Sequence, residues 1–321
     1  MAKKVLVTGG AGFIGSHAAD FFLSQGWEVS IVDDLSSGRS ENLPKQARFH
    51  ELSITTPEFA GIVRDGKFDV VAHLGAQIDI RKSVDDPIFD ATSNVLGTLN
   101  LMEAIRASRS RTLVVFASTG GALYGDTGKP PNHETTPKDP ESPYAVSKLS
   151  SEHYLSYYGR VHGIEAAALR FGNVYGPRQD PHGEAGVVAI FCGRILRGEK
   201  LTIFGDGHQT RDYVYVGDVA RAIFTAATQP LPVKGGIDAR AFNIGTGRGT
   251  SVVELAKLLQ NAAGSNVPVA FAAARAGEVR DSFLACAKAH ELLGWKPDVT
   301  LQEGLKRTFS WFAEQSQRGK A

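Results

Sequence analysis

The stretch that most constrains this chain is "VTGGAGFIGS", which begins at Val7 and joins an apolar run to an amphipathic one. Its glycines match both G-x-G-x-x-G and G-x-x-G-x-x-G. Glycines let such a turn close tightly and let the backbone approach a pyrophosphate, and the helix that follows offers free N–H groups to the phosphates. The stretch therefore predicts a dinucleotide-binding strand–loop–helix unit. The cofactor-binding residues that we predict in it are Gly9, Gly12, Phe13, Ile14 and Gly15.

An acidic pair ends the next apolar run and indicates which dinucleotide is bound. Asp33 closes "VSIVDD", eighteen residues beyond Gly15, and Asp34 follows it. A carboxylate at this position can accept hydrogen bonds from the adenosine ribose and would repel a 2′-phosphate. We therefore predict NAD rather than NADP, with Asp33 and Asp34 at the ribose. The alternative is a tight turn with a surface aspartate, but strand, loop, helix and acid follow one another in the required order.

The alternation of apolar runs with amphipathic segments predicts the fold. Strands buried on both faces of a parallel sheet read as nearly continuous apolar sequence, and four such runs occur, at 3–9, 28–34, 68–75 and 111–119. Helical patterns at 12–26 and 91–108 lie between them. This rhythm predicts an α/β protein with a doubly wound parallel (Rossmann) sheet and a smaller C-terminal α/β substrate-binding domain. The expected boundaries are 1–173 for the NAD-binding domain, with a return near 212–247, and 174–321 for the substrate-binding domain.

A tyrosine and a lysine share one face of another predicted helix. In "SPYAVSK", Ser142 is a good N-cap and Pro143 suits the first helical position, so Tyr144 and Lys148 lie at i and i+4 near a helix start. A nearby ammonium lowers the pKa of a phenol from its usual value near 10, which would make Tyr144 a proton acceptor. On its own, this spacing also occurs on many solvated helices.

A hydroxyl pair strengthens the catalytic interpretation. "FASTGGALYG" ends the preceding strand and places Ser118 and Thr119 at its carboxyl end, where doubly wound sheets bind their ligands. One of these hydroxyls can bond the same substrate oxygen as Tyr144. The other reading, a hydroxyl that caps backbone, is plausible for one of the two residues, so the choice between them stays open.

Composition excludes several other classes of function. Lys and Arg number 35 against 34 Asp and Glu, so no basic excess would attract nucleic acid or an anionic membrane. Two cysteines do not make a disulfide framework, and they fit a reducing cytoplasm. No Cys/His cluster has the spacing of a metal site, and no apolar run approaches the roughly 20 residues that span a bilayer.

Eight ordered motifs together resemble the extended short-chain dehydrogenase/reductases, and among them most of all the UDP-glucose 4-epimerases. They are "TGGAGFIGSH", "VDDLSSG", "HLGAQ", "ASTGGALYG", "SPYAVSK", "LRFGNVYGPRQ", "IFGDGHQTRDYVYVGDVARA" and "ARAGEVRDS". The resemblance covers nearly the whole chain. It implies NAD as cofactor, a UDP-sugar as substrate, and a homodimer joined through the helices at 91–108 and 144–162.

The resemblance also implies roles for individual residues. Tyr144 would be the general base and acid on the sugar 4-hydroxyl, and Lys148 would hold the nicotinamide ribose. Thr119 would be the hydroxyl partner, with Ser118 as second choice. Besides the loop and the acidic pair, the residues implied to bind NAD are Ser53, Ile54, Leu74, Gly75, Ala76, Asn94, Tyr144, Lys148 and Phe171. Those implied to bind the UDP-sugar are Thr119, Asn173, Phe204, Arg211, Arg275, Glu278 and Ser282.

Three details bear on the reaction that the resemblance implies. Gly120 and Gly121 stand where the related 4,6-dehydratases need an acid pair, which argues against that activity. Ser53 replaces an aspartate that often meets the adenine amine. Ser282 is small, which goes with acceptance of N-acetylated sugars. The alternatives left open are a UDP-glucuronate 4-epimerase or decarboxylase, and a non-catalytic NAD-binding module, since fold does not fix function.

Overall fold

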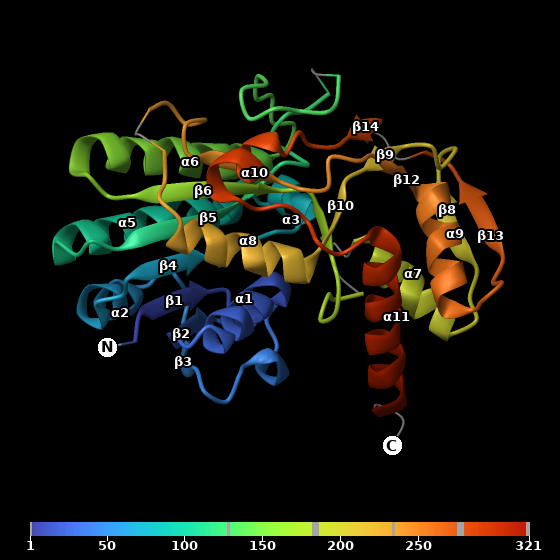
Figure 1. Ribbon diagram of the computed structural model, residues 1–321, viewed down its shortest axis with the longest axis horizontal. Helices are drawn as coiled ribbons and strands as arrows, with labels where there is room; N and C mark the ends of the chain where they lie inside the picture. Colours follow the sequence, from blue (N-terminus) through green and yellow to red (C-terminus); the bar gives the residue numbers. More distant parts are fainter. Residues whose placement is uncertain (1, 127–128, 182–185, 233–234, 275–278, 319–321) are drawn as a thin grey trace.

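Seven parallel strands form the main sheet of the computed structural model, which describes residues 2–126, 129–181, 186–232, 235–274 and 279–318. They are β1 (Lys4–Thr8), β2 (Glu28–Asp33), β3 (Arg48–Glu51), β4 (Val70–His73), β5 (Leu113–Thr119), β6 (Ala166–Phe171) and β11 (Ala241–Ile244). Their order across the sheet is β3-β2-β1-β4-β5-β6-β11 (Figure 1). The order reverses between β1 and β4, which is where sheets of this type bind ligands.

The pairing register brings the carboxyl ends of the central strands to one edge. Thr8 of β1 lies opposite His73 of β4, His73 lies opposite Phe116 of β5, and Thr119 lies opposite Phe171 of β6. The loops that leave these strands therefore start side by side. The four apolar runs predicted as parallel strands are confirmed, with their ends within two residues of the expected ones.

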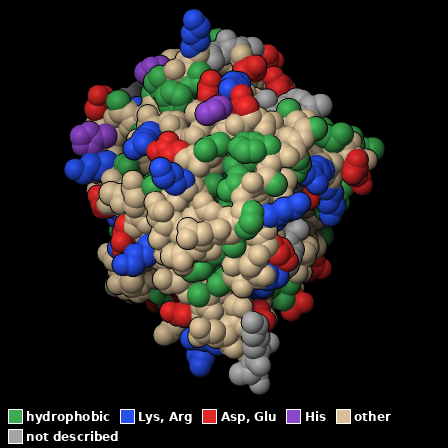
Figure 2. Space-filling view, turned by 90° about the vertical axis from the view of Figure 1, so that its right-hand side faces the viewer, with side chains coloured by type: hydrophobic (Ala, Val, Ile, Leu, Met, Phe, Trp, Pro, Cys, Tyr) green, Lys and Arg blue, Asp and Glu red, His purple; other side chains and the backbone are tan. Residues whose placement is uncertain are grey.

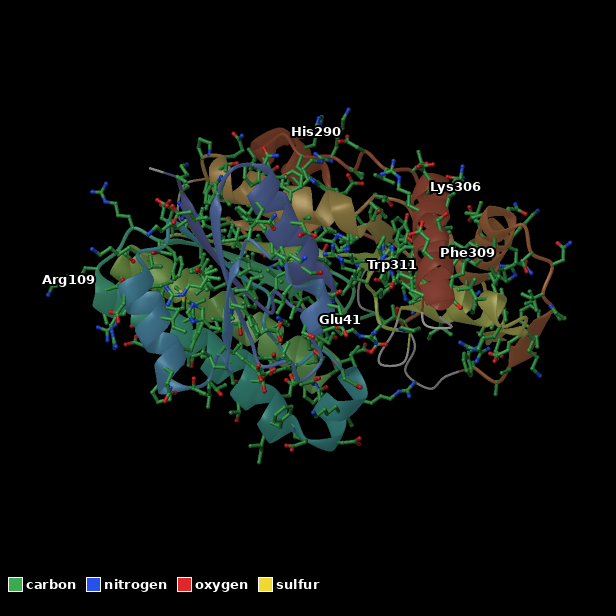
Figure 3. The ribbon with its side chains drawn as sticks, turned by 90° about the horizontal axis from the view of Figure 1, so that it is seen from below. Glu41, Arg109, His290, Lys306, Phe309 and Trp311 are labelled. Atoms are coloured by element: carbon green, nitrogen blue, oxygen red, sulfur yellow. The ribbon has the colours of Figure 1, made fainter. Side chains whose placement is uncertain are left out.

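Helices cover both faces of this sheet, as the doubly wound prediction requires (Figures 1 and 3). One face packs on α1 (Phe13–Ser24), α8 (Val216–Thr228) and α10 (Ala287–Leu293), with Phe22 and Ile223 in its core. The other face packs on α2 (Pro57–Gly66), α5 (Gly97–Ser108) and α6 (Pro143–His162), with Phe59 and Leu155 in its core. Residues of the strands alternate between these two cores, which explains why the strands are apolar throughout.

The predicted helix at 91–108 has a more complex start than expected. The helices α3 (Ile80–Asp85) and α4 (Pro87–Ala91) precede a π-helical turn, η2 (Thr92–Leu96), which leads into α5. The Asn94 carbonyl in that turn accepts hydrogen bonds from the hydroxyls of Thr98 and Ser151, at 2.7 and 3.2 Å. Side chains thus help to satisfy a carbonyl that a regular helix would bond along its own backbone. Such π turns are frequent at functional sites.

The C-terminal part contributes a third core, which lies to the right in Figure 1. It is built from α7 (Val187–Leu196), α9 (Val252–Ala263), α11 (Leu301–Arg318) and the paired strands β8 (Leu201–Phe204) and β13 (Val269–Ala272). Phe309 and Trp311 of α11, labelled in Figure 3, pack against this core. Figure 2 faces this part and shows apolar side chains interspersed with charges of both signs. The remaining elements are η1 (Ser40–Asn42), β7 (Asn173–Tyr175), β9 (Thr210–Arg211), β10 (Tyr213–Tyr215), β12 (Thr250–Ser251) and β14 (Asp281–Ser282).

The chain crosses between the two parts more than once. After β8 and β9 it returns to the main sheet through α8 and β11, and β11 pairs with β6 in parallel register. It then leaves again through β12 and α9. Two short sheets, β7-β10 and β12-β9-β14, lie along this path. The exact domain boundaries, 1–173 and 174–321, stay a prediction.

Candidate active site

The loop between β1 and α1 is shaped by close backbone contacts. Gly9 has φ +68°, and a Cβ built on it would lie 2.8 Å from the Gly75 nitrogen. A Cβ on Gly15 would lie only 2.0 Å from the Gly9 carbonyl oxygen. Gly12 precedes α1, and no side chain caps that helix start, so the first-turn amides at Phe13 and Ile14 are available to an anion. The missing side chains at Gly9 and Gly15 therefore let the loop close on itself and on the loop after β4, which is the form that phosphate-binding loops take before a helix.

The Asp33 carboxylate holds the glycine loop from the end of β2. It accepts hydrogen bonds from the amides of Ala11 and Leu35, both at 2.9 Å. Burial raises its pKa, although these backbone N–H groups work in the opposite direction. A carboxylate has about four acceptor positions, so Asp33 can bind a ribose hydroxyl as well. Asp34 is exposed and accepts bonds from the amide and hydroxyl of Ser36.

The loop after β4 lies against the glycine loop. The Thr8 hydroxyl accepts hydrogen bonds from the amides of Leu74 and Gly75, at 3.1 and 2.9 Å, and Ala76 follows them, half-buried. Asn94 holds the next residue, because its side chain accepts from the Gln77 amide and donates to the Gln77 carbonyl. Asn94, which the resemblance implied as an NAD-binding residue, thus supports the backbone at the edge of the site.

The two residues predicted at the adenine follow β3. Ile54 is buried and lies against α5, since a Cβ on Gly97 would come within 2.7 Å of its side chain. The Ser53 hydroxyl is 3.0 Å from that of Thr55, so it already has a local partner. Neither side chain carries a charge. Recognition of the adenine amine at this place would therefore use neutral groups.

The tyrosine–lysine pair sits at the start of α6, as predicted. The Ser142 hydroxyl accepts a bond from the Ala145 amide, so the expected N-cap is confirmed. Lys148 is buried, and its ammonium lies 6.0 Å from the centre of the Tyr144 ring. The same ammonium donates to the Ala117 carbonyl at 3.0 Å and lies 4.7 Å from the centre of the Phe116 ring. Lys148 therefore faces the carboxyl end of β5, with Tyr144 one helical turn before it.

We expected Lys148 to lower the pKa of the Tyr144 phenol, but the groups around Tyr144 raise it. Burial raises the pKa of Tyr144, and the negative charge of Asp90 raises it further. Burial also lowers the pKa of Lys148 to about 8, against the opposing effects of Asp90 and Glu152. Lys148 directs its ammonium to a β5 carbonyl rather than to the phenol oxygen, which explains the difference from expectation.

The structure separates the two candidate hydroxyls. Ser118 is buried and donates to the Glu152 carboxylate at 2.5 Å, within a cluster of buried charges. Thr119 is the last residue of β5, is half-buried, and makes no hydroxyl hydrogen bond to any residue in the described ranges. Successive residues of a strand point to opposite faces. This geometry favours Thr119 as the hydroxyl that is available to a ligand.

The residues after β6 line the same edge of the sheet. Phe171 is buried beside Thr119 in the pairing register. Asn173 is exposed, and its side-chain oxygen would lie 3.7 Å from a Cβ on Gly121. A Cβ on Gly120 would instead come within 2.6 Å of Leu284. Position 120 therefore has no room for an acidic side chain unless Leu284 moves.

The residues predicted at the UDP end come from three short strands. Arg211 of β9 pairs with Ser282 of β14 in parallel register, and Ser282 is buried. One guanidinium nitrogen of Arg211 donates to the Thr210 carbonyl at 2.8 Å. Phe204 ends β8 and is half-buried. The predicted residues Arg275 and Glu278 lie outside the described residues.

Two groups of buried charges at this site were not predicted. Asp90 of α4 is fully buried and accepts a hydrogen bond from Ser147 at 2.6 Å. Glu152 of α6 is buried and pairs with Arg170 of β6 at 2.6 Å, and Arg170 also donates to Tyr124 at 3.1 Å. The only sequence signal is that Glu152 stands at i+4 from Lys148 on the predicted helix. Asp90 stands in a run of acidic residues that reads as a solvated loop.

Two classes of site find no support among the described residues. No group of three or more His, Cys, Asp or Glu side chains there could hold a metal ion. No helix in the described ranges combines the length and the apolar character that crossing a membrane requires.

The chain is similar to one family of known enzymes over most of its length. A family model described as the NAD dependent epimerase/dehydratase family matches residues 5–245. A UDP-glucose 4-epimerase of Mycolicibacterium smegmatis is 44% identical over 319 residues, which cover 98% of this chain and 100% of that protein.

Two solved structures have the same fold. A UDP-glucose 4-epimerase of Thermotoga maritima, solved with UDP-glucose, has a TM-score of 0.92 and 46% identity, and the match covers 98% of this chain and 99% of that one. A UDP-glucose 4-epimerase of Thermus thermophilus, solved with NAD, has a TM-score of 0.88 and 44% identity, and that match covers 97% and 99%.

Proposed function

Because the chain belongs to the NAD-dependent epimerase/dehydratase family, we propose that it catalyses the NAD-dependent 4-epimerisation of a UDP-sugar, with UDP-glucose and UDP-galactose as the first pair. The observation that carries this proposal is the position of Tyr144 and Lys148. Lys148 donates to a β5 carbonyl two residues before Thr119, and Tyr144 lies one helical turn before Lys148, at the edge of the sheet where the glycine loop also starts. A protein that only bound NAD would have no use for a proton acceptor there.

The residues of the cofactor side fit NAD. Side chains at Gly9 and Gly15 would meet the backbone of Gly75 and Gly9, so these glycines let the loop close as a pyrophosphate-binding turn requires. Asp33 offers acceptor positions to a ribose, and its charge disfavours a 2′-phosphate. Lys148 would hold the nicotinamide ribose, and Phe171 would lie near the ring. NAD, when bound, supplies the acceptor and later the donor of the hydride exchanged with sugar carbon 4.

The chain's own part in the reaction is proton transfer and positioning. Tyr144, as phenolate, would take the proton of the sugar 4-hydroxyl while that carbon is oxidised to a ketone. Thr119 would hold the same oxygen by its hydroxyl. The 4-keto sugar would then turn within the site, and Tyr144 would return the proton once the opposite face of the ketone has been reduced. Substrate and product thus differ only in configuration.

The raised pKa of Tyr144 makes positive charge essential to this mechanism. Burial and Asp90 both oppose the phenolate, so a compensating cation must stand close by. Lys148 is the cation that the chain supplies, with its ammonium 6.0 Å from the ring centre. Its pKa of about 8 leaves it mostly protonated at neutral pH.

The nucleotide end must stay bound while the sugar turns. We propose that Arg211 and Arg275 clamp the diphosphate, because a guanidinium presents several donors in a plane. Asn173 would bind the diphosphate as well. Phe204 would pack on the uracil, and Glu278 would accept the uridine ribose hydroxyls. Ser282 adjoins Arg211 in the β14–β9 register and is small, which would leave room for an N-acetyl group.

A 4,6-dehydratase is disfavoured by the space at Gly120. That activity needs acidic groups just after the active-site hydroxyl. A side chain at position 120 would meet Leu284 and the Arg170 carbonyl oxygen. The epimerisation requires no such group, so the two glycines are compatible with it.

The proposal includes a homodimer in which a second copy covers one apolar face. The exposed apolar residues Val146, Tyr154, Tyr157 and Val161 follow one another at helical spacing along α6. Leu96, at the start of α5, is exposed as well. The α5 and α6 helices of two copies would form a four-helix arrangement about a twofold axis, the commonest symmetry of homo-oligomers. The cytoplasmic location also stays a proposal and rests on the two cysteines, both unpaired.

The first experiment is proton NMR of the purified protein incubated with UDP-galactose and no added NAD. We expect the anomeric signals of UDP-glucose to appear, because the cofactor stays bound through each cycle. Tyr144→Phe should reduce the rate by about 10²-fold or more, while NAD released by denaturation is recovered in full. A wild-type protein that retains NAD but leaves UDP-galactose unchanged would contradict the proposal.

A further inference from the structure

Asp90 is a buried carboxylate that the reaction described above does not use. It lies on α4 with none of its surface exposed. One of its oxygens accepts hydrogen bonds from the side chains of Gln77, at 2.9 Å, and Asn94, at 3.0 Å. The other accepts from the Ser147 hydroxyl at 2.6 Å. A buried charge costs free energy unless it is well bonded, and these three donors satisfy it.

The three donors connect Asp90 to three segments near the reacting groups. Gln77 belongs to the loop after β4, and Asn94 to the π turn. Ser147 lies on α6 between Tyr144 and Lys148. The carboxylate therefore joins the cofactor-side loop to the helical turn that carries the proton acceptor.

The charge of Asp90 also acts on both residues of the pair. It raises the pKa of Lys148, as Glu152 does, against the lowering by burial to about 8. It also adds to the effect of burial in raising the pKa of Tyr144. His73 of β4 is neutral near pH 7, because burial and then the charge of Lys148 lower its pKa to about 3.

Apart from Asp79, the charged residues of α3 and of its junction with α4 are exposed to solvent. The elements packed against α4 are α3, η2 and α6. The π turn has no titratable side chain, and α6 contributes Tyr144, Lys148 and Glu152. Asp79 is half-buried and caps α3. The charged residues of α3 and its junction with α4 are exposed and are Arg81, Lys82, Asp85 and Asp86.

We propose that Asp90 is a positioning residue for the epimerisation: its hydrogen bonds to Gln77, Asn94 and Ser147 fix the turn of α6 between Tyr144 and Lys148, and its buried charge acts on both of these residues. This rests on the proposed roles of Tyr144 and Lys148. Two buried carboxylates, Asp90 and Glu152, then face two buried cations, Lys148 and Arg170, and Glu152 is paired directly with Arg170. Asp90 also sets how readily the phenol loses its proton.

Removal of the Asp90 charge should shift both limbs of the pH profile in the same direction. Because the negative charge of Asp90 raises the pKa of both Tyr144 and Lys148, its removal lowers both. The acid limb of the pH profile reports formation of the Tyr144 phenolate, and the alkaline limb reports loss of the Lys148 proton. Both limbs therefore move to lower pH in a variant without the charge.

The test compares Asp90→Asn with Ser147→Ala, by kcat/KM for UDP-galactose between pH 5.5 and 9.5. The asparagine oxygen can still accept from Gln77 and Asn94, and its nitrogen can donate to the Ser147 hydroxyl. We expect both limbs to move down by about one pH unit in Asp90→Asn, the scale on which one neighbouring charge acts. Ser147→Ala keeps the charge, so its limbs should stay in place even where its rate falls.

An unshifted profile in a folded Asp90→Asn variant overturns the proposal and leaves Asp90 a structural residue. If that variant is recovered unfolded, Asp90→Ser, which is neutral and can bond Ser147, is measured in its place by the same criterion. Failure of the proposed function has a different signature. In that case Tyr144→Phe would keep full activity, or the wild-type protein would have no profile to shift.

Discussion

At the scale of single residues, two adjacent hydroxyls meet different surroundings. Ser118 belongs to a buried cluster in which it donates to Glu152 and Glu152 pairs with Arg170. Thr119, one residue later, reaches the end of the strand and the edge of the sheet. The period of two along a strand separates them. Ser118 is therefore engaged by Glu152, and we propose that Thr119 is the hydroxyl that meets the substrate.

We expect Thr119→Val to lower kcat on the order of 10²-fold, because it removes one donor to the reacting oxygen. Its stability should change little. Ser118→Ala is the matched control, which should lower stability by about 1–3 kcal/mol through loss of a bond to a buried charge. NMR rates and urea denaturation measure the two effects. The assignment fails if Ser118→Ala, while still folded, loses the greater share of kcat.

Ser282 is the residue that we expect to set substrate breadth. Its position beside Arg211 in the β14–β9 register puts it at the proposed sugar-nucleotide site. Ser282→Tyr should remove activity on UDP-N-acetylglucosamine and largely keep activity on UDP-glucose, because the larger side chain takes the N-acetyl space. Parallel NMR assays of the two substrates check this. Undiminished N-acetyl activity in the variant would count against the idea.

At the scale of elements, α6 is the platform of the site. Its first turn carries Tyr144, its second Lys148, and its third Glu152, which ties the helix to β6 through Arg170. Arg170 also donates to the Glu134 carbonyl at 2.9 Å. The helix is thus held at fixed depth against β5 and β6. That depth places the lysine ammonium at the carboxyl end of β5.

Removing Glu152 should be strongly destabilising. Glu152→Ala leaves Arg170 buried without its principal counterion, and losing one partner of a buried pair costs about 3–5 kcal/mol. Glu303→Ala is the control, because its pair with Arg307 is exposed and should matter far less. The midpoints of urea denaturation measure both changes in stability, provided that the dependence of the free energy of unfolding on urea stays the same. Similar midpoints for the two variants would show that the buried network does not hold α6.

At the scale of the whole molecule, the two sides of the site come from different parts of the chain. The main sheet supplies the proposed cofactor side, and β8, β9 and β14 supply the proposed nucleotide side. Their alignment depends on β11 returning to the main sheet before the chain leaves it again. A substrate that bridges both parts would be held at one end and worked on at the other.

The proposed dimer gives a prediction at this scale. Val161→Glu, on the exposed apolar row of α6, should convert a dimer into a monomer, because a second copy would have to bury that charge. Val269→Glu on β13 is the control, since it is also exposed and apolar but lies outside that row. Light scattering after gel filtration gives the masses. A wild-type monomer, or a Val161→Glu dimer, would exclude this interface.

Much of this architecture could be read from the sequence because it depends on local rules. Each of these rules depends on only a few neighbouring residues. Examples are glycines at fixed spacing, an acid at a strand end, near-continuous apolar strands and the Ser142–Pro143 helix start. These patterns predicted the doubly wound sheet, the glycine cradle and the start of α6, and the structure has all three.

The contacts between segments far apart in the chain could not be predicted from the sequence and are seen only in the folded structure. Asp90 meets Ser147 across 57 positions, and that distance in sequence hid its influence on Tyr144 and Lys148. Ser118 donates to Glu152, 34 positions away, which leaves Thr119 as the proposed hydroxyl for the substrate. The pKa of a buried group depends on what surrounds it in space. Burial and then the charge of Asp90 therefore raise the pKa of Tyr144, where the tyrosine–lysine spacing had suggested a lowered one.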